Sequence, residues 1–251
     1  KTVRKVFPEC KDVTLEEVYK DLQFVAHLER PYVAINMVST VDGRTTAGGR
    51  MQQTPIGSRA DRELMGWVRH AADIVVRGAQ TVRANPSYPG VADNLVAIRR
   101  QKGMADQPLA AIITQTGNLP YDAPIFAEGP RRPVVIACSA TPVEALERLR
   151  ERAHVLVVGQ DQVDVSEALQ RLRTDFGVQS VLLEGGPTLN YHFLRRGLVD
   201  ELFWTVAPKM IGGKAELSMV EGKDPFDPWV QLKLLSAYTF KDELFLRYRV
   251  L

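Results

Sequence analysis

Glu184 is the residue with the clearest chemical context in the sequence. It follows the apolar run Val181–Leu183, which predicts a buried strand, and it precedes two glycines. Open α/β sheets bind ligands at the carboxyl ends of their strands, so we expect this carboxylate to face a ligand crevice. It can hold two hydroxyls of a sugar or, if burial raises its pKa, pass a proton to a developing alkoxide. A purely structural role, in which it caps nearby backbone N–H groups, stays open.

The segment after Glu184 predicts a tight turn that leads into a helix. Gly185 and Gly186 lack a Cβ where another backbone or a ligand has to come close, Pro187 fits the first helical turn, and Gly197 ends the helix. The free N–H groups and the dipole of a helix N-terminus favour an anion such as a nucleotide phosphate. The turn does not match GxGxxG, so a turn used only for packing is an equally good interpretation.

Other predicted strand ends are also polar, and hydroxyls and glycines dominate them. This composition favours a phosphorylated cofactor bound through N–H and hydroxyl groups. The four histidines form no ligand motif, so we expect no metal, and neither a GxSxG elbow nor a Walker A motif is present. These polar ends are Ser39-Thr40 with Asp42, Gly78–Thr81, Thr114–Gly117, Ser139 and Glu184–Thr188.

Strands and helices alternate over most of the chain, which predicts an α/β fold with three layers, an αβα sandwich. The last two strands, Val230–Thr239 and Leu244–Leu251, have no helix between them and form a C-terminal antiparallel hairpin, so the central sheet is mixed and mostly parallel. The other predicted strands are Tyr32–Val38, Asp73–Arg77, Leu109–Thr114, Pro133–Cys138, Val155–Val158, Val181–Leu183 and Glu201–Pro208. Helices are predicted from Ser58 to Ala72, Thr81 to Asn85, Thr141 to Arg152 and Asp164 to Phe176.

The sequence offers no linker that would split the main body of the chain. Residues 1–29 are predicted to be an N-terminal arm with a helix, which opens at a Thr14–Glu17 capping box after a loose segment 1–13. Residues 30–251 are predicted to be a single domain. Gly48-Gly49 predicts a flexible loop, and Val91–Gln107 gives no clear prediction.

Composition excludes several classes of function. The chain has 251 residues, 45% of them hydrophobic and 25% charged, with a formal net charge of +2, so neither a nucleic acid nor a membrane is expected as a partner. No apolar run reaches the length of a membrane span and no signal peptide opens the chain. Cys10 and Cys138 form no disulfide framework, so we expect a cytoplasmic protein.

Three stretches in this order resemble the reductase of riboflavin biosynthesis: RPYVAINMVSTVDGR, GAQTVRANP, and LLEGGPTLN with LVDELFWTVAPKMIGG. The resemblance covers about Arg30 to Leu251. It implies a dihydrofolate-reductase-like fold and an NADPH-dependent reduction of the ribose of a 5-phosphoribosylaminopyrimidine to the ribityl form. The substrate is either the uracil or the 2,5-diamino pyrimidinone. The zinc pattern of a deaminase half is missing, so we expect the standalone form of the reductase.

The resemblance also implies roles for particular residues. Arg69 and Glu184 match substrate contacts, and Asp42 joins them in the predicted substrate site. Asn36 stands where many bifunctional members have lysine; we predict it to be catalytic with Glu184, although an amide cannot supply a proton. The predicted cofactor contacts are Ser39, Thr81, Asn85, Thr114, Thr116, Gly185, Gly186, Pro187 and Thr188, with Asn85 replacing the family's usual aspartate.

Two further expectations concern the cofactor and the partner. We expect NADPH over NADH, because Thr114, Thr116 and Ser139 end strands without an acidic residue placed to take a ribose 2′-hydroxyl. We expect a homodimer, because the C-terminal hairpin has more apolar positions than one sheet face needs, namely Leu232, Leu234, Phe245 and Leu246. An ordinary sandwich core is the other interpretation of these positions and stays open. A reductase of the same fold acting on a pteridine or a dihydrofolate, and a nucleotide-binding protein without turnover, remain as alternatives.

Overall fold

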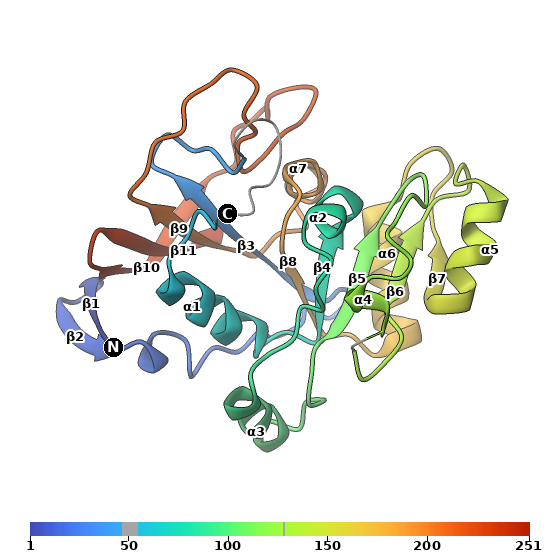
Figure 1. Ribbon diagram of the computed structural model, residues 1–251. Coiled ribbons are helices and arrows are strands. Elements are labelled where there is room, and N and C mark those ends of the chain that lie inside the picture. Colours follow the sequence, from blue (N-terminus) through green and yellow to red (C-terminus); the bar gives the residue numbers. More distant parts are fainter. Residues whose placement is uncertain (47–54, 128) are drawn as a thin grey trace. The chain divides into compact units, whose positions relative to one another are not determined.

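The computed structural model in Figure 1 describes residues 1–46, 55–127 and 129–251, and the contacts within the chain divide it into two units. Unit 1 contains Lys1–Gln23, Val33–Val68 and Gly185–Leu251, and unit 2 contains Phe24–Tyr32 and Arg69–Glu184. The predicted loop at Gly48-Gly49 lies outside the described residues. Whether residues 30–251 behave as one domain stays a prediction.

Unit 2 is built on a parallel sheet with the strand order β8-β4-β5-β6-β7. Each strand is a short apolar run that is buried almost throughout, as expected when helices cover both faces of a parallel sheet. The sequence predicted all five, with ends displaced by a residue or two. The strands are β4 (Ile74–Gly78), β5 (Leu109–Ile113), β6 (Val134–Ala137), β7 (His154–Val157) and β8 (Ser180–Leu183).

Helices pack on both faces of this sheet. Ile112 of β5 contacts a buried cluster with Val82 of α2 and Leu149 of α5. The preceding residue, Ala111, points to the opposite face and is also fully buried. The helices of this unit are α2 (Ala79–Ala84), α3 (Asp93–Gln101), α4 (Pro124–Ala127), α5 (Val143–Arg152) and α6 (Val165–Phe176). Of these, α3 falls in the stretch Val91–Gln107, for which no clear prediction was possible.

The ends of α6 follow the sequence signals, whereas the start of α5 does not. The Asp164 carboxylate accepts hydrogen bonds from the N–H groups of Ser166 and Glu167, at 2.9 and 3.1 Å, and Gly177 ends α6 in the left-handed conformation. The helix predicted to start at Thr141 begins at Val143 without a side-chain cap, because the Thr141 hydroxyl donates to the Gln115 carbonyl at 2.7 Å instead.

Unit 1 contains a largely antiparallel sheet with the order β2-β1-β10-β11-β9-β3, in which β3 and β9 pair in parallel. The predicted C-terminal hairpin is present as β10 and β11 (Figure 1). The loose arm predicted for residues 1–13 is wrong, because this segment forms two strands and β1 pairs with β10. The strands are β1 (Thr2–Phe7), β2 (Lys11–Thr14), β3 (Tyr32–Thr40), β9 (Glu201–Ala207), β10 (Leu232–Phe240) and β11 (Glu243–Val250).

The predicted N-terminal helix is reduced to a single 3-10 turn, η1 (Glu16–Val18). The capping box itself forms, because the Thr14 N–H donates to the Glu17 carboxylate at 2.7 Å and the Glu17 N–H donates to the Thr14 hydroxyl at 3.3 Å.

The two faces of the unit 1 sheet have different coverings. On one face, α1 (Arg59–Arg69) packs its apolar residues, such as Leu64, near Phe203 and Phe245. On the other, Met37 and Leu202 line a cavity of about 680 Å³ together with α7 (Pro187–Arg195) and the segment 219–230. The α/β class with a mixed sheet is thus confirmed.

No helix among the described residues is long and apolar enough to cross a membrane.

Candidate functional site

Glu184 and Arg69 form a buried, bidentate ion pair. The Arg69 Nε donates to Oε1 at 2.5 Å and Nη2 donates to Oε2 at 2.7 Å, the geometry in which an arginine fork fits a carboxylate best. Arg69 lies at the end of α1, and Glu184 directly follows β8. The side chains are 12% and 5% exposed. The structure therefore brings together the two substrate contacts that the resemblance implied.

Arg77, which the sequence analysis did not single out, is a second arginine on the same carboxylate. It lies on β4, its side chain is 4% exposed, and its Nη2 donates to Glu184 Oε2 at 3.2 Å. Its Nη1 donates to the carbonyl of Ser87 at 3.0 Å. The sequence does contain a sign of this role, because Arg77 is the charged residue in the otherwise apolar strand Ile74–Gly78, and a buried charge requires a partner.

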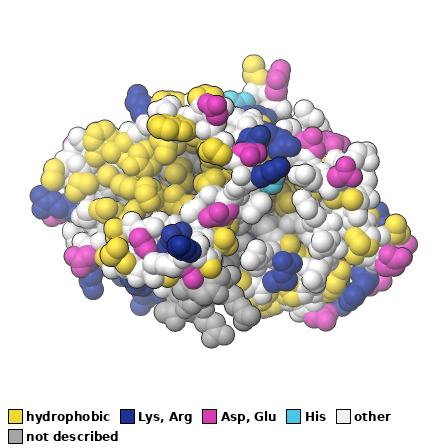
Figure 2. Space-filling view, turned by 90° about the horizontal axis from the view of Figure 1, so that it is seen from above, with side chains coloured by type: hydrophobic (Ala, Val, Ile, Leu, Met, Phe, Trp, Pro, Cys, Tyr) yellow, Lys and Arg dark blue, Asp and Glu magenta, His cyan; other side chains and the backbone are white. Residues whose placement is uncertain are grey.

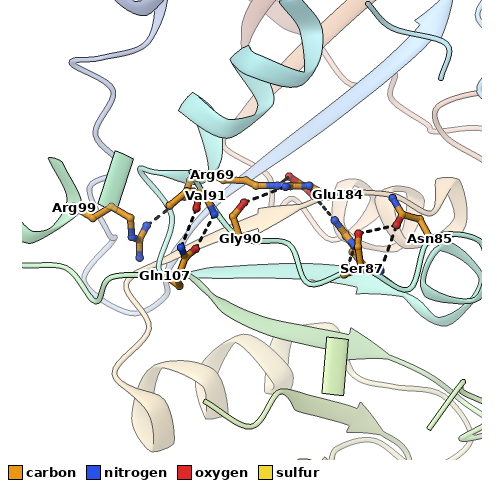
Figure 3. Close-up of polar contacts among 9 residues, drawn as sticks. Arg69, Asn85, Ser87, Gly90, Val91, Arg99, Gln107 and Glu184 are labelled. Atoms are coloured by element: carbon orange, nitrogen blue, oxygen red, sulfur yellow. Dashed lines mark hydrogen bonds and ion pairs between the residues drawn. The ribbon is translucent and has the colours of Figure 1, made fainter. Parts of the chain in front are cut away.

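The segment that follows α2 is held around this ion pair (Figure 3). Arg69 Nη1 donates to the Gly90 carbonyl at 3.2 Å. At Val91, the N–H donates to the Gln107 side-chain oxygen at 2.7 Å and the carbonyl accepts from the Gln107 amide at 2.9 Å. The backbone from Ser87 to Val91 is thus fixed by side chains from three other parts of unit 2.

Arg99 supports the backbone beside Arg69. It is fully buried and donates from Nη1 to the carbonyls of Arg69, His70 and Ala72, at 3.3, 2.9 and 2.8 Å. Its Nε donates to the Ala105 carbonyl at 2.7 Å. The Arg69 carbonyl belongs to the last turn of α1, and the His70 and Ala72 carbonyls lie in the turn after it, so Arg99 connects the end of the helix to this turn.

The electrostatics make Glu184 an ionised acceptor. Burial raises the pKa of its carboxyl, but the charges and hydrogen bonds of Arg69 and Arg77 outweigh burial and leave the pKa below its usual value. Burial in turn lowers the pKa of Arg77, and Glu184 opposes that shift. A carboxylate in this state accepts hydrogen bonds from hydroxyls; it does not hold a proton to donate near neutral pH.

The predicted cofactor residues of unit 2 lie directly after strands. Thr81 is buried in α2, directly after β4, and Asn85 follows the helix, where its side-chain oxygen accepts from the Ser87 hydroxyl at 2.7 Å. After β5, the buried Thr114 hydroxyl accepts from the Gly117 N–H at 3.0 Å, and the exposed Thr116 hydroxyl accepts from the Asn118 N–H. These turns are thus ordered by their own side chains.

Two predicted residues of unit 1 use their polar atoms locally. The Ser39 hydroxyl is fully buried and accepts from the Trp204 indole N–H at 2.9 Å. The Asp42 carboxylate accepts from the Thr40 hydroxyl at 2.5 Å and from the Gly212 N–H at 2.7 Å. These hydrogen bonds, that of Thr40 first, lower the pKa of Asp42 to about 2. Asp42 therefore fastens the 208–213 loop to the end of β3.

Asn36 lies on the α1 side of β3. With Asp61 and Thr205 it lines a void of about 10 Å³, roughly the space of one water. Its catalytic role stays a prediction.

The glycine turn has the backbone that its sequence suggested. Gly185 and Gly186 have φ of +86° and +42°, which L side chains rarely adopt, and Pro187 begins α7 with Thr188 after it. The turn therefore needs glycine for its conformation, and it leaves the first N–H groups of a nine-residue helix free of side-chain caps. This fits an anionic group, as the resemblance implies. Within the described residues, no group of His, Cys, Asp and Glu side chains could hold a metal ion.

Comparison with known proteins decides the family. Residues 31–246 match the RibD C-terminal domain. The chain belongs to the RibD C-terminal domain family. Two of the curated proteins that it resembles are matched over nearly their whole length. It is 32% identical to the 2,5-diamino-6-ribosylamino-4(3H)-pyrimidinone 5′-phosphate reductase of Methanothermobacter thermautotrophicus, covering 88% of this chain and 99% of the relative. It is 30% identical to the Aquifex aeolicus protein of the same name, covering 89% and 98%.

Two solved structures share the fold. A pyrimidine reductase-like protein from Corynebacterium diphtheriae superposes with a TM-score of 0.81 at 23% identity, covering 95% of this chain and 99% of that one. RibD of Acinetobacter baumannii gives 0.73 at 25% identity, covering 89% of this chain and 59% of the longer protein. The predicted dihydrofolate-reductase-like α/β class is therefore confirmed.

Proposed function

We propose that this chain is an NADPH-dependent reductase of riboflavin biosynthesis, which reduces the ribose of a 5-phosphoribosylaminopyrimidine to the ribityl form. The observation that carries the proposal is the ionised Glu184, held by two arginines at the end of β8 and followed by the glycine turn, in a chain of the RibD C-terminal domain family. The names of the Methanothermobacter thermautotrophicus and Aquifex aeolicus relatives specify the 2,5-diamino pyrimidinone phosphate, so we take the amino form as the preferred substrate.

The proposed cofactor contacts are the glycine turn in unit 1 and the polar strand ends in unit 2. The first turn of α7, with Gly185, Gly186 and Thr188, would receive the pyrophosphate, because its N–H groups and the helix dipole favour an anion. Thr114 and Thr116 would meet the adenosine ribose, where hydroxyls without a carboxylate favour a 2′-phosphate. The bound nicotinamide supplies the hydride, and the protein holds donor and acceptor in place.

The substrate site is assigned to Arg69 and Glu184. Glu184 accepts hydrogen bonds from ribose hydroxyls, and Arg69 binds the anionic end of the substrate. Glu184 is ionised near neutral pH because its pKa is lowered, and Arg69 and Glu184 both lie on backbone that is held by hydrogen bonds. Positioning of this kind is the main contribution a protein makes to hydride transfer.

The activity is tested with a panel of acceptors. Oxidation of NADPH is followed with the 2,5-diamino pyrimidinone phosphate, its deaminated uracil analogue, dihydrofolate and a pteridine, and each reaction is repeated with NADH. We expect turnover with the phosphoribosyl pyrimidines, fastest with the diamino form, and a higher kcat/KM with NADPH. Turnover of dihydrofolate or the pteridine alone would support the other reductase, and NADPH binding without any turnover would support the non-catalytic alternative.

We further propose that the enzyme is a homodimer that pairs through the open face of the unit 1 sheet. Leu246 lies opposite Trp204 and Leu244 opposite Val206, and none of these four is fully buried. Figure 2 shows a hollowed surface area in which hydrophobic side chains gather. Trp229, which is 79% exposed, lines the cavity on this side of the sheet. Such a patch is typical of an interaction surface.

The residues that form this surface differ in one respect from those predicted. Phe245 is only 2% exposed and points to the face that α1 covers, next to Tyr19. It belongs to the core, because successive residues of a strand point to opposite faces. Leu232 and Leu246 remain partly exposed.

A further inference from the structure

Two arginines of unit 2 pair with the same carboxylate. Two buried guanidinium groups, of Arg69 and Arg77, meet the single carboxylate of Glu184. These two arginines are also the charged groups that act on the pKa of Glu184. Burying a charge is costly unless it is paired, so a second arginine at this position requires an explanation beyond the pairing of Glu184 with Arg69.

The geometry leaves Glu184 little capacity for substrate as long as Arg69 stays in place. A carboxylate offers about four acceptor positions. Arg69 occupies two of them, at 2.5 and 2.7 Å, and Arg77 occupies a third, at 3.2 Å. A sugar that uses two hydroxyls on Glu184 therefore has to displace at least one contact of Arg69 or Arg77.

Of the two arginines, Arg77 has the more firmly fixed position. It lies on β4, which pairs with β8 through Val76 and Leu183, and the Glu184 N–H donates to the Val76 carbonyl at 3.0 Å. The backbones of Arg77 and Glu184 are therefore neighbours in the sheet. Arg69 instead reaches the carboxylate from the end of a helix, and its side chain is more exposed, 12% against 4%.

We propose that Arg77 is a positioning residue, which keeps Glu184 ionised and oriented while Arg69 leaves the carboxylate to bind the anionic end of the substrate. This inference rests on the proposed function. Arg77 balances the charge of Glu184 at the moment when Arg69 no longer does. Without Arg77, burial would favour the neutral acid, and a neutral acid has lost part of its capacity to accept hydroxyls.

Arg77 also connects Glu184 to the neighbouring loop. Its Nη1 donates to the Ser87 carbonyl, and the Ser87 hydroxyl donates to the Asn85 side chain (Figure 3). Asn85 is a predicted cofactor contact. Arg77 thus holds both the carboxylate of Glu184 and the loop that carries Asn85.

The test compares Arg77→Met, Arg77→Lys and Arg69→Met with the wild type. In Arg77→Met, we expect the acid limb of the pH profile of kcat, which reports the substrate-bound enzyme, to move up by about one unit or more, because an opposite charge nearby lowers a carboxyl pKa by roughly that amount. Arg77→Lys, which keeps the charge, should restore most of the wild-type profile. Arg69→Met should raise KM for the phosphorylated substrate and leave the acid limb in place. Arg100→Gln, which breaks the exposed pair of Arg100 with Asp106, is the matched control.

The outcomes separate this inference from the proposed function. An unchanged acid limb in Arg77→Met, or an equal shift in Arg69→Met, would overturn the role of Arg77 while leaving the reductase intact. If Arg77→Met does not fold, the pH profile of Arg69→Met provides the test. An acid limb that stays in place shows that Arg77 is sufficient to keep Glu184 ionised, and a limb that moves up shows that it is not. If the wild type shows no turnover, NMR titration of the Glu184 carboxyl carbon in free Arg77→Lys and Arg69→Met still tests the claim. The carboxyl should stay ionised in both, and protonation near neutral pH in Arg69→Met would refute it.

Discussion

Replacing Glu184 with glutamine tests the energetics of the ion-pair cluster directly. The change preserves shape and volume but removes the charge that compensates Arg69 and Arg77. All three side chains are at most 12% exposed, so water compensates little of the loss. Breaking a buried ion pair by removing one partner typically costs about 3–5 kcal/mol. For a chain of this size, about 1 kcal/mol shifts Tm by roughly 2–4 °C, so we expect Tm to fall by roughly 6–20 °C.

The cost should depend on pH in a defined direction. The pKa of Glu184 is lower in the folded state than its usual value, so its ionised form stabilises the fold at pH values above that usual value. This stabilisation is lost as the pH falls through the lowered pKa of the folded state. The difference in stability between wild type and Glu184→Gln should therefore be full at neutral pH and shrink in acid.

The assay is thermal and urea unfolding, followed by circular dichroism from neutral to acidic pH. Wild type, Glu184→Gln, Arg77→Met and the double variant together form a double-mutant cycle. Because the double variant removes one charge of each sign, it should lose less stability than the sum of the single variants. A loss below about 1 kcal/mol for Glu184→Gln, with additive single effects, would refute the buried-cluster reasoning. Turnover should fall as well, since glutamine is a poorer acceptor for sugar hydroxyls.

Three further variants test other parts of the structure. Asp164→Ala should cost about 1 kcal/mol by removing the α6 cap, measured by urea unfolding, and the exposed Asp161→Ala should cost almost nothing. Gly186→Val should abolish NADPH binding, measured by calorimetry, while the circular dichroism spectrum stays that of the folded protein. A variant that binds NADPH with wild-type affinity would show that the glycines serve packing and not phosphate binding. Leu246→Glu should give a monomer by analytical ultracentrifugation at micromolar protein, whereas the exposed Val143→Glu should not; a dimer in both would place the interface elsewhere.

The parallel strands were predictable because their sequences are local and unambiguous. Val134–Ala137 and Ser180–Leu183 are short apolar runs between turn residues, and burial on both faces permits no other composition. The N-terminal strands were missed because Thr2–Phe7 lacks a regular alternation of apolar and polar residues and obtains its partner from β10, far along the chain. Such pairing depends on contacts that no local pattern contains.

In the candidate site, too, local features could be predicted from the sequence, whereas pairings between distant residues could not. The glycine turn at Gly185-Gly186 is a local signal and was predicted with its helix. The pairing of Arg69 with Glu184, 115 positions apart, came only from the resemblance to a family. Arg77 was visible as a charge in an apolar strand, but its partner could not be inferred without knowing that β4 lies beside β8.

The state of Glu184 also constrains the chemistry of the proposed reaction. Reduction of the sugar carbon requires a proton as well as a hydride. Glu184 is ionised, because Arg69 and Arg77 outweigh its burial, and the Asn36 amide has no proton to give near neutral pH. If the proposed function holds, the proton therefore comes from water or from a group outside the predicted catalytic pair. Glu184 then acts by accepting hydroxyl hydrogen bonds, which orients the sugar carbon for the hydride.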